Sequence, residues 1–196
     1  MKIQNRISVY AGSFDPVTLG YLWMIRTGSS FFDKLVIAVG TNPDKKCYFS
    51  LRNRIKMFQE SILGYRNVTI DKYPKQFLIK YANTIGAQFI LRGIRSTSDY
   101  EYEKSLSYIN RKLNPEIVTV FLFPPREMVE ISSSVVRGLI GPEGWEEVVG
   151  KYVPPCVLER IRLGKGSETL ASLSAGKRKP PRDNFGGQTP VRNKDG

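Results

Sequence analysis

Two short segments carry side chains and backbone groups suited to binding phosphate. Residues 12–16 read Gly-Ser-Phe-Asp-Pro and follow a short β-type run. A glycine-rich turn of this kind, placed before a helix, lets backbone N–H groups approach a phosphate. Residues 92–95 read Arg-Gly-Ile-Arg after another apolar run, and guanidinium groups form paired hydrogen bonds with phosphate oxygens. Either segment alone could be an ordinary turn or a solvated surface, and together they indicate a site for a phosphorylated ligand.

Three further segments could contribute to such a site. Lys45 lies in a loop after an apolar run, where it either neutralises a phosphoryl group or is simply solvated. Acidic residues at 99, 101 and 103 either complement a helix dipole, or Glu103 points into the site and holds an adenosine hydroxyl. The serines at 132–134 either cap a helix or direct hydroxyls and N–H groups at phosphates.

The elements that must position these residues alternate between strand and helix patterns. Short apolar runs that predict strands occur at 7–10, 34–40, 68–70, 89–91 and 118–123. Helical spacing occurs at 19–31, 51–63, 77–85 and 99–113, and a further helix is expected to start at Val135. This alternation predicts an α/β fold with a doubly wound, five-stranded parallel sheet of Rossmann-like type. The loops 11–20, 41–50, 92–98 and 124–134 all follow strands, so we expect them to gather at one edge of the sheet.

Composition divides the chain into one domain, residues 1–163, and a flexible basic tail, residues 164–196. The 196 residues carry a net charge of +12, and the tail alone has seven Lys/Arg and three Asp/Glu. This excess favours polyanionic partners, either nucleotides or nucleic acid bound through the tail, or it is a generally basic surface. No apolar run is long enough for a bilayer, and the two cysteines give neither a disulfide framework nor a metal site. We therefore expect a cytoplasmic protein without membrane association.

Taken together, these segments resemble the phosphopantetheine adenylyltransferases of bacterial coenzyme A biosynthesis, which belong to the nucleotidyltransferase superfamily. The resemblance runs from Ile7 to about Leu163. Its narrowest feature is the combination of residues 92–95 with Asp-Tyr-Glu-Tyr-Glu at 99–103. The resemblance implies a transferase that converts ATP and 4′-phosphopantetheine into dephospho-CoA and pyrophosphate, with Mg²⁺ as cofactor, in a homohexamer.

The resemblance also implies which residues act, by matching positions. It assigns ATP to Ser13, Phe14, Tyr21, Gly93, Ile94, Arg95, Glu103, Met128, Val129, Glu130, Ile131, Ser132, Ser133 and Ser134. It assigns the acceptor to Ser13, Lys45, Leu78 and Arg92. Tyr21, Lys45 and Arg92 are the implied catalytic residues, and no residue is implied as a metal ligand. Catalysis would be in-line attack by the acceptor phosphate on the α-phosphorus, assisted by positioning and charge stabilisation.

Three positions depart from the family pattern. Tyr21 stands where the family has a histidine that contacts the ATP phosphates, and the chain contains no histidine. A tyrosine hydroxyl donates one hydrogen bond but cannot become a cation. Since losing one such contact typically costs on the order of 10²–10³ in rate, a reduced rate is expected. Gln76 replaces an expected acidic residue near the pantetheine arm, and Met128 replaces an expected aromatic residue near the adenine.

These departures leave two alternatives open. One is a degenerate homologue that binds ATP or a CoA-type ligand without turnover. The other is an adenylyltransferase with a different phosphorylated acceptor, since Gln76 and Leu78 lie where the acceptor arm would rest.

Overall fold

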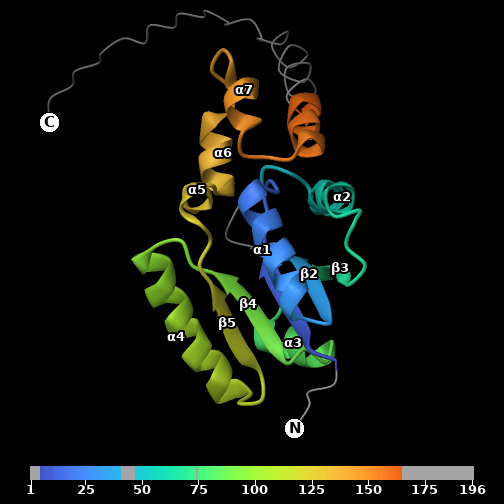
Figure 1. Cartoon of the computed structure of the whole chain (residues 1–196), viewed down its shortest axis with the longest axis vertical. Helices are drawn as coiled ribbons and strands as arrows, with labels where there is room; N and C mark the ends of the chain where they lie inside the picture. Colours follow the sequence, from blue (N-terminus) through green and yellow to red (C-terminus); the bar gives the residue numbers. More distant parts are fainter. Residues whose placement is uncertain (1–4, 41–46, 74, 165–196) are drawn as a thin grey trace, which may run out of the picture. The chain divides into compact units, whose positions relative to one another are not determined.

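A computed structural model describes residues 5–40, 47–73 and 75–164. Its sheet contains five parallel strands in the order β3-β2-β1-β4-β5 (Figure 1). The strands are β1 (Ile7–Gly12), β2 (Lys34–Gly40), β3 (Val68–Tyr73), β4 (Phe89–Gly93) and β5 (Val118–Leu122). The predicted doubly wound, five-stranded parallel sheet is confirmed. Because the chain reverses direction across the sheet after β3, β1 and β4 flank the point at which such folds bind ligands.

Helices connect successive strands, and several short ones follow β5. They are α1 (Leu19–Phe31), α2 (Leu51–Ser61), α3 (Leu78–Thr84), α4 (Thr97–Leu113), α5 (Arg126–Val129), α6 (Ser133–Leu139) and α7 (Trp145–Val149). Residues 155–164 are also helical. None of the helices over these described stretches has the length and apolarity needed to cross a bilayer.

The central strands of the sheet are buried on both faces and are mostly apolar. Side chains of β1 alternate between the two faces: Tyr10 enters one core, and Val9 and Ala11 enter the other. The first core contains Ile25 of α1 together with residues of α2, and the second core contains Ile79 of α3. Two-sided burial holds the strand ends, and therefore the loops that follow them, in fixed positions.

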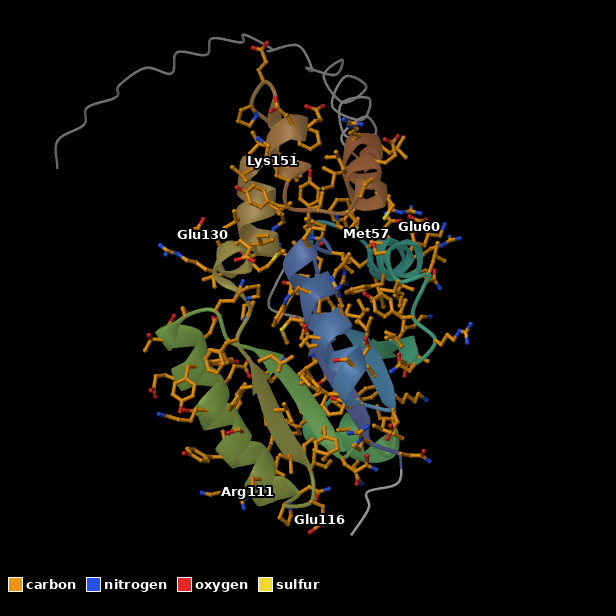
Figure 2. The ribbon with its side chains drawn as sticks, in the orientation of Figure 1. Met57, Glu60, Arg111, Glu116, Glu130 and Lys151 are labelled. Atoms are coloured by element: carbon orange, nitrogen blue, oxygen red, sulfur yellow. The ribbon has the colours of Figure 1, made fainter. Side chains whose placement is uncertain are left out.

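The segment after α7 completes the first core. Val157 and Ile161 are fully buried there. The N–H of Leu19, at the start of α1, donates to the Tyr152 carbonyl at 2.8 Å. Glu60 of α2 accepts a bidentate pair of hydrogen bonds from Arg160, with Nε 3.0 Å from Oε2 (Figure 2).

The compact unit thus extends to Ile161. From residue 165 onward, the predicted tail lies outside the described residues.

Two helices begin earlier than the sequence predicts, and two others, α2 and α3, are one or two residues shorter at their ends than predicted. The helix expected from Asp99 begins instead at Thr97, because the Ser96 hydroxyl accepts a hydrogen bond from the Asp99 N–H at 3.1 Å and caps it. The helix expected from Val135 begins at Ser133, because Ser132 caps it in the same way. The four-residue helix α5 was not predicted, since a single turn is too short to show helical periodicity.

The C-terminal helix offers a test of where the folded unit ends. Ile161→Ala should destabilise the protein by about 2–5 kcal/mol, because it opens a cavity in the first core. Leu163→Ala, at a side chain that is 65% exposed, should change stability by less than about 0.5 kcal/mol. Truncation after Leu163 should also change the melting temperature little. Chemical denaturation of the three variants checks these values, and a large loss on truncation would contradict the predicted boundary.

Candidate active site

The turn after β1 is built around a buried phenylalanine. Phe14 is 2% exposed and has a backbone φ of 50°, in the left-handed region that costs a non-glycine residue about 1–3 kcal/mol. Its ring makes edge contacts with Tyr10, Tyr21 and Phe58 at centroid distances of 5.2, 5.0 and 4.9 Å. A Cβ at residue 12 would lie 3.0 Å from this ring, which explains the glycine there. The aromatic contacts therefore offset the strain and fix the turn.

Two buried ionic side chains hold the same turn through backbone groups. The carboxylate of Asp15 accepts hydrogen bonds from the N–H groups of Tyr48 and Phe49 at 2.6 and 2.8 Å. The guanidinium of Arg54 is fully buried and donates to the carbonyls of Phe49 (3.1 Å), Gly40 (2.6 Å) and residue 13. Since Gly40 ends β2, these bonds join the turn after β1 to the end of β2 and the start of α2.

Arg92 at the end of β4 pairs with Glu103 of α4. Its guanidinium makes a bidentate ion pair, with Nε 2.7 Å from Glu103 Oε2, and Nη1 donates to the Ala11 carbonyl at 3.0 Å. Burial lowers the pKa of Arg92, but the adjacent Glu103 carboxylate outweighs burial and leaves the pKa above its usual value. Glu103 is only 8% exposed and lines the cavity described below. The structure thus supports the interpretation that Glu103 points into the site, rather than only complementing the helix dipole.

Arg95 lies at the mouth of the site and is more exposed than Arg92. Its Nε donates to Asp99 Oδ2 at 3.1 Å, and both side chains line the cavity. Burial raises the pKa of nearby Tyr10, so its phenol stays neutral. Among the described residues, the charged side chains that line this cavity are two guanidinium groups (Arg92 and Arg95) and two carboxylates (Asp99 and Glu103).

Tyr21, in the first turn of α1, contacts two parts of the site. Its ring packs edge-on against Phe14, and its hydroxyl lies 3.2 Å from the hydroxyl of Ser133. The preceding residue is Gly20, where a Cβ would lie 3.3 Å from the Ile131 carbonyl oxygen. This close approach brings α1 against the segment between α5 and α6.

The hydroxyls of residues 132–134 all have partners within the protein. Ser132 caps α6, accepting from the Val135 N–H at 3.1 Å. Ser133 donates to the Pro16 carbonyl at 2.8 Å, and Ser134 accepts from Arg137 at 3.2 Å. Capping, the first of the two interpretations, is therefore confirmed for Ser132, while the assignment of these serines to ATP stays a prediction.

The carboxyl ends of β1 and β4 enclose a cavity of about 220 Å³ that collects most of the predicted residues. Those lining it are Ser13, Phe14, Tyr21, Arg92, Gly93, Arg95, Glu103, Met128 and Ile131. A second cavity of about 470 Å³ shares Arg95 and Pro124 with the first and is lined by Ile94 and Val129. The two cavities together receive residues from the predicted loops at 11–20, 92–98 and 124–134, and most of the loop at 41–50 lies outside the described residues.

Two other predicted residues, Leu78 and Glu130, lie elsewhere. Leu78 begins α3 and packs against the second core. Glu130 is exposed at the end of α5, where Figure 2 shows it on the outer side. Neither residue lines either cavity. Lys45 lies outside the described residues.

Sequence reasoning missed Arg54 and Arg137, which hold the site together. Arg54 occupies a helical position that reads as an ordinary polar residue, and nothing in the sequence marks it as buried. Arg137 Nη1 donates to the Asp15 carbonyl, a contact between segments 122 positions apart. Tyr10 was also missed, although its place beside the glycine-rich turn could have indicated it.

This arrangement of strand-end loops, a strained turn before α1 and guanidinium groups at β4 defines a nucleotidyltransferase-type α/β protein. Residues 9–139 match the family model described as cytidylyltransferase-like. In structure, the chain is similar to Plasmodium falciparum nicotinic acid mononucleotide adenylyltransferase complexed with NaAD. The TM-score is 0.62 at 17% identity, covering 81% of this chain and 95% of that one. At this identity the likeness concerns the fold.

Curated relatives define the family more narrowly. The chain is 52% identical over 154 residues to phosphopantetheine adenylyltransferase of Chromobacterium violaceum, covering 79% of this chain and 94% of that protein. It is 53% identical over 156 residues to that of Neisseria meningitidis serogroup C, covering 80% and 92%. The relative from Caldanaerobacter subterraneus is 38% identical, covering 80% and 95%. The chain therefore belongs to the phosphopantetheine adenylyltransferase family.

The ion pair between β4 and α4 gives a test of how the site is held. Arg92→Ala should destabilise the fold by about 2 kcal/mol. Removing one partner leaves a carboxylate largely buried without its counter-charge, although partial exposure reduces the cost below the 3–5 kcal/mol of fully buried pairs. The double variant Arg92→Ala/Glu103→Gln should recover part of that loss, because it also removes the unpaired charge. Urea denaturation of both variants and of Glu103→Gln checks this, and a double variant less stable than Arg92→Ala would contradict it.

Proposed function

We propose that this protein transfers the adenylyl group of ATP to 4′-phosphopantetheine, producing dephospho-CoA and pyrophosphate. The observation that carries the proposal is the cavity lined by Arg92, Arg95 and Glu103 at the carboxyl ends of β1 and β4. Membership of a family whose curated members are named phosphopantetheine adenylyltransferases supports it. Two guanidinium groups beside one cavity suit a reaction that joins two phosphorylated molecules.

The chain's own groups would act by positioning and by charge stabilisation, with no covalent intermediate. An acceptor phosphate on Arg92 would replace the Glu103 carboxylate in a similar paired geometry. Glu103 would then be available to accept a hydrogen bond from an adenosine hydroxyl. Binding of the acceptor would thus prepare the nucleotide side of the site. The guanidinium of Arg95 would offset the negative charge of the nucleotide phosphates.

Mg²⁺ would enter this site with the nucleotide. Over the described residues, no group of three or more Asp, Glu, Cys or His side chains could hold a metal ion. The two carboxylates at the cavity, Asp99 and Glu103, are paired with arginines. Mg²⁺ commonly uses substrate phosphates and waters as ligands, and there it would neutralise triphosphate charge.

We further propose that the protein is cytoplasmic and forms a homo-oligomer, which by family resemblance is a hexamer. Helix α4 exposes Tyr102, Tyr108, Ile109 and Leu113, and the edge strand β5 exposes Val118. Apolar side chains gathered on neighbouring elements are typical of subunit contacts. Both cysteines are free thiols, which fits a reducing compartment. Sedimentation equilibrium would measure the oligomer.

A second candidate function is nucleotide binding without turnover. The observation in its favour is that the Tyr21 hydroxyl contacts Ser133, so the one replaced motif residue already has a protein partner. ATP binding by calorimetry together with absence of pyrophosphate release, in the presence of 4′-phosphopantetheine and Mg²⁺, would establish this alternative.

Pyrophosphate release provides the direct test of the proposed reaction. The protein should release pyrophosphate only when ATP and 4′-phosphopantetheine are both present. Arg95→Ala should lower the rate on the order of 10²–10³, as expected for losing one preorganised charge. Arg111→Ala, which removes an exposed arginine near the other end of α4 (Figure 2), is the matched control and should be close to wild type. Equal effects of the two substitutions would contradict the assignment of Arg95.

Replacing Tyr21 by histidine separates a handicapped enzyme from a binding-only homologue. Tyr21→His should raise the rate, because an imidazole can donate to a phosphate oxygen as a neutral ring or as a cation. The gain could approach the factor of about 10²–10³ associated with one preorganised donor. Tyr21→Phe is the control, since it changes the side chain without adding a donor, and it should give no gain. A Tyr21→His variant that binds ATP but is no faster would count against the handicapped-enzyme view.

A further inference from the structure

We infer that Tyr21 is a positioning residue that acts through Ser133, and that its hydroxyl proton is not directed at a ligand. The inference rests on the proposed function, because it takes the cavity at β1 and β4 to be the nucleotide site. It assigns Tyr21 a role different from that of the phosphate-contacting histidine for which it substitutes.

The first step is the direction of the hydrogen bonds around Ser133. Its Oγ lies 2.8 Å from the Pro16 carbonyl oxygen. A carbonyl oxygen can only accept, so the single hydroxyl proton of Ser133 points to Pro16. The Tyr21 hydroxyl is 3.2 Å from the same Oγ. Tyr21 must therefore be the donor in that contact, and its only proton is used there.

The second step is what this chain of bonds connects. Ser133 is buried at the start of α6, and Tyr21 lies in the first turn of α1. The chain from Tyr21 through Ser133 to Pro16 thus joins α1, α6 and the turn after β1. The segment leading into α6 places Met128 and Ile131 on the wall of the cavity. The Tyr21 hydroxyl consequently helps to set the distance between that wall and α1.

The third step concerns charge. With its proton used, the Tyr21 oxygen can only accept hydrogen bonds, and a deprotonated phosphate oxygen has no proton to give. Tyr21 therefore gives no stabilisation to a phosphate in this arrangement. Charge on the phosphates is met instead by the guanidinium groups of Arg92 and Arg95 at the same cavity.

A double-mutant cycle distinguishes action through Ser133 from direct contact with the ligand. The variants are Tyr21→Phe, Ser133→Ala and the double variant. Each is measured for affinity of a non-hydrolysable ATP analogue by calorimetry, for kcat and KM by pyrophosphate release, and for stability by denaturation. A control cycle uses Tyr65→Phe in place of Tyr21→Phe and combines it with Ser133→Ala. Tyr65 suits this purpose because it packs on the first core and does not line the cavity.

We expect Tyr21→Phe to weaken analogue binding about twofold to tenfold, the range for one neutral hydrogen bond, with the change in KM for ATP rather than in kcat. Ser133→Ala should weaken it at least as much. The double variant should be no weaker than Ser133→Ala, because the tyrosine hydroxyl has nothing to act on once Ser133 is gone. In the control cycle, the effects of Tyr65→Phe and Ser133→Ala should simply multiply.

Three results would overturn the inference. One is a double variant whose loss equals the product of the two single losses. Another is a fall in kcat on the order of 10²–10³ for Tyr21→Phe, which would mark a direct transition-state contact. The third is a Tyr21→Phe variant with wild-type affinity and stability. Analogue binding without pyrophosphate release by the wild type would overturn only the proposed function, whereas no analogue binding at all would overturn both.

Discussion

The buried guanidinium of Arg54 is the interaction on which the geometry of the site depends. Its hydrogen bonds to three backbone carbonyls join the turn after β1, the end of β2 and the approach to α2. A buried charge is costly unless its donors are satisfied, and here Nε and Nη1 donate to carbonyl dipoles of three chain segments, while Nη2 has no hydrogen-bond partner among the described residues. Removing Arg54 would leave those carbonyls without a donor. The cavity keeps its shape because this one side chain links chain segments that the sheet alone would not align.

The strained turn at Phe14 likewise depends on contacts with neighbouring side chains. A phenylalanine with left-handed backbone angles persists only where several surrounding contacts hold it in place. Here the next residue, Asp15, is anchored because its carboxylate accepts hydrogen bonds from the N–H groups of Tyr48 and Phe49, and the Phe14 ring is enclosed by three aromatic side chains. Tyr21 is one of these three, so the side chain at the position where the resemblance expects a histidine affects packing as well as hydrogen bonding. The fold accommodates a tyrosine ring, which is larger than an imidazole, at residue 21 because this ring completes the aromatic cluster around Phe14.

Sequence reasoning recovered the sheet and most of the cavity wall for physical reasons. Apolar runs and helical spacing are local patterns, and parallel topology then brings strand-end loops to one edge. It could not recover Arg54, because burial of a helix arginine depends on which loops meet above it. Nor could it show that Arg92 and Glu103 bind each other. That pairing depends on how α4 packs beside β4, whereas position in a motif assigns each residue to a separate ligand.

Four arginines around the cavity divide into two kinds by the partners they have. Arg54 and Arg137 donate to backbone carbonyls of the turn after β1 and of the end of β2. Arg92 and Arg95 both pair with carboxylates on the cavity wall, although Arg92 also donates to the Ala11 carbonyl. A phosphate can replace a carboxylate in the same paired geometry, and the displaced carboxylate can accept other donors or water. The first two arginines are therefore fixed parts of the frame, and ligand exchange falls to the two that β4 and the loop after it present.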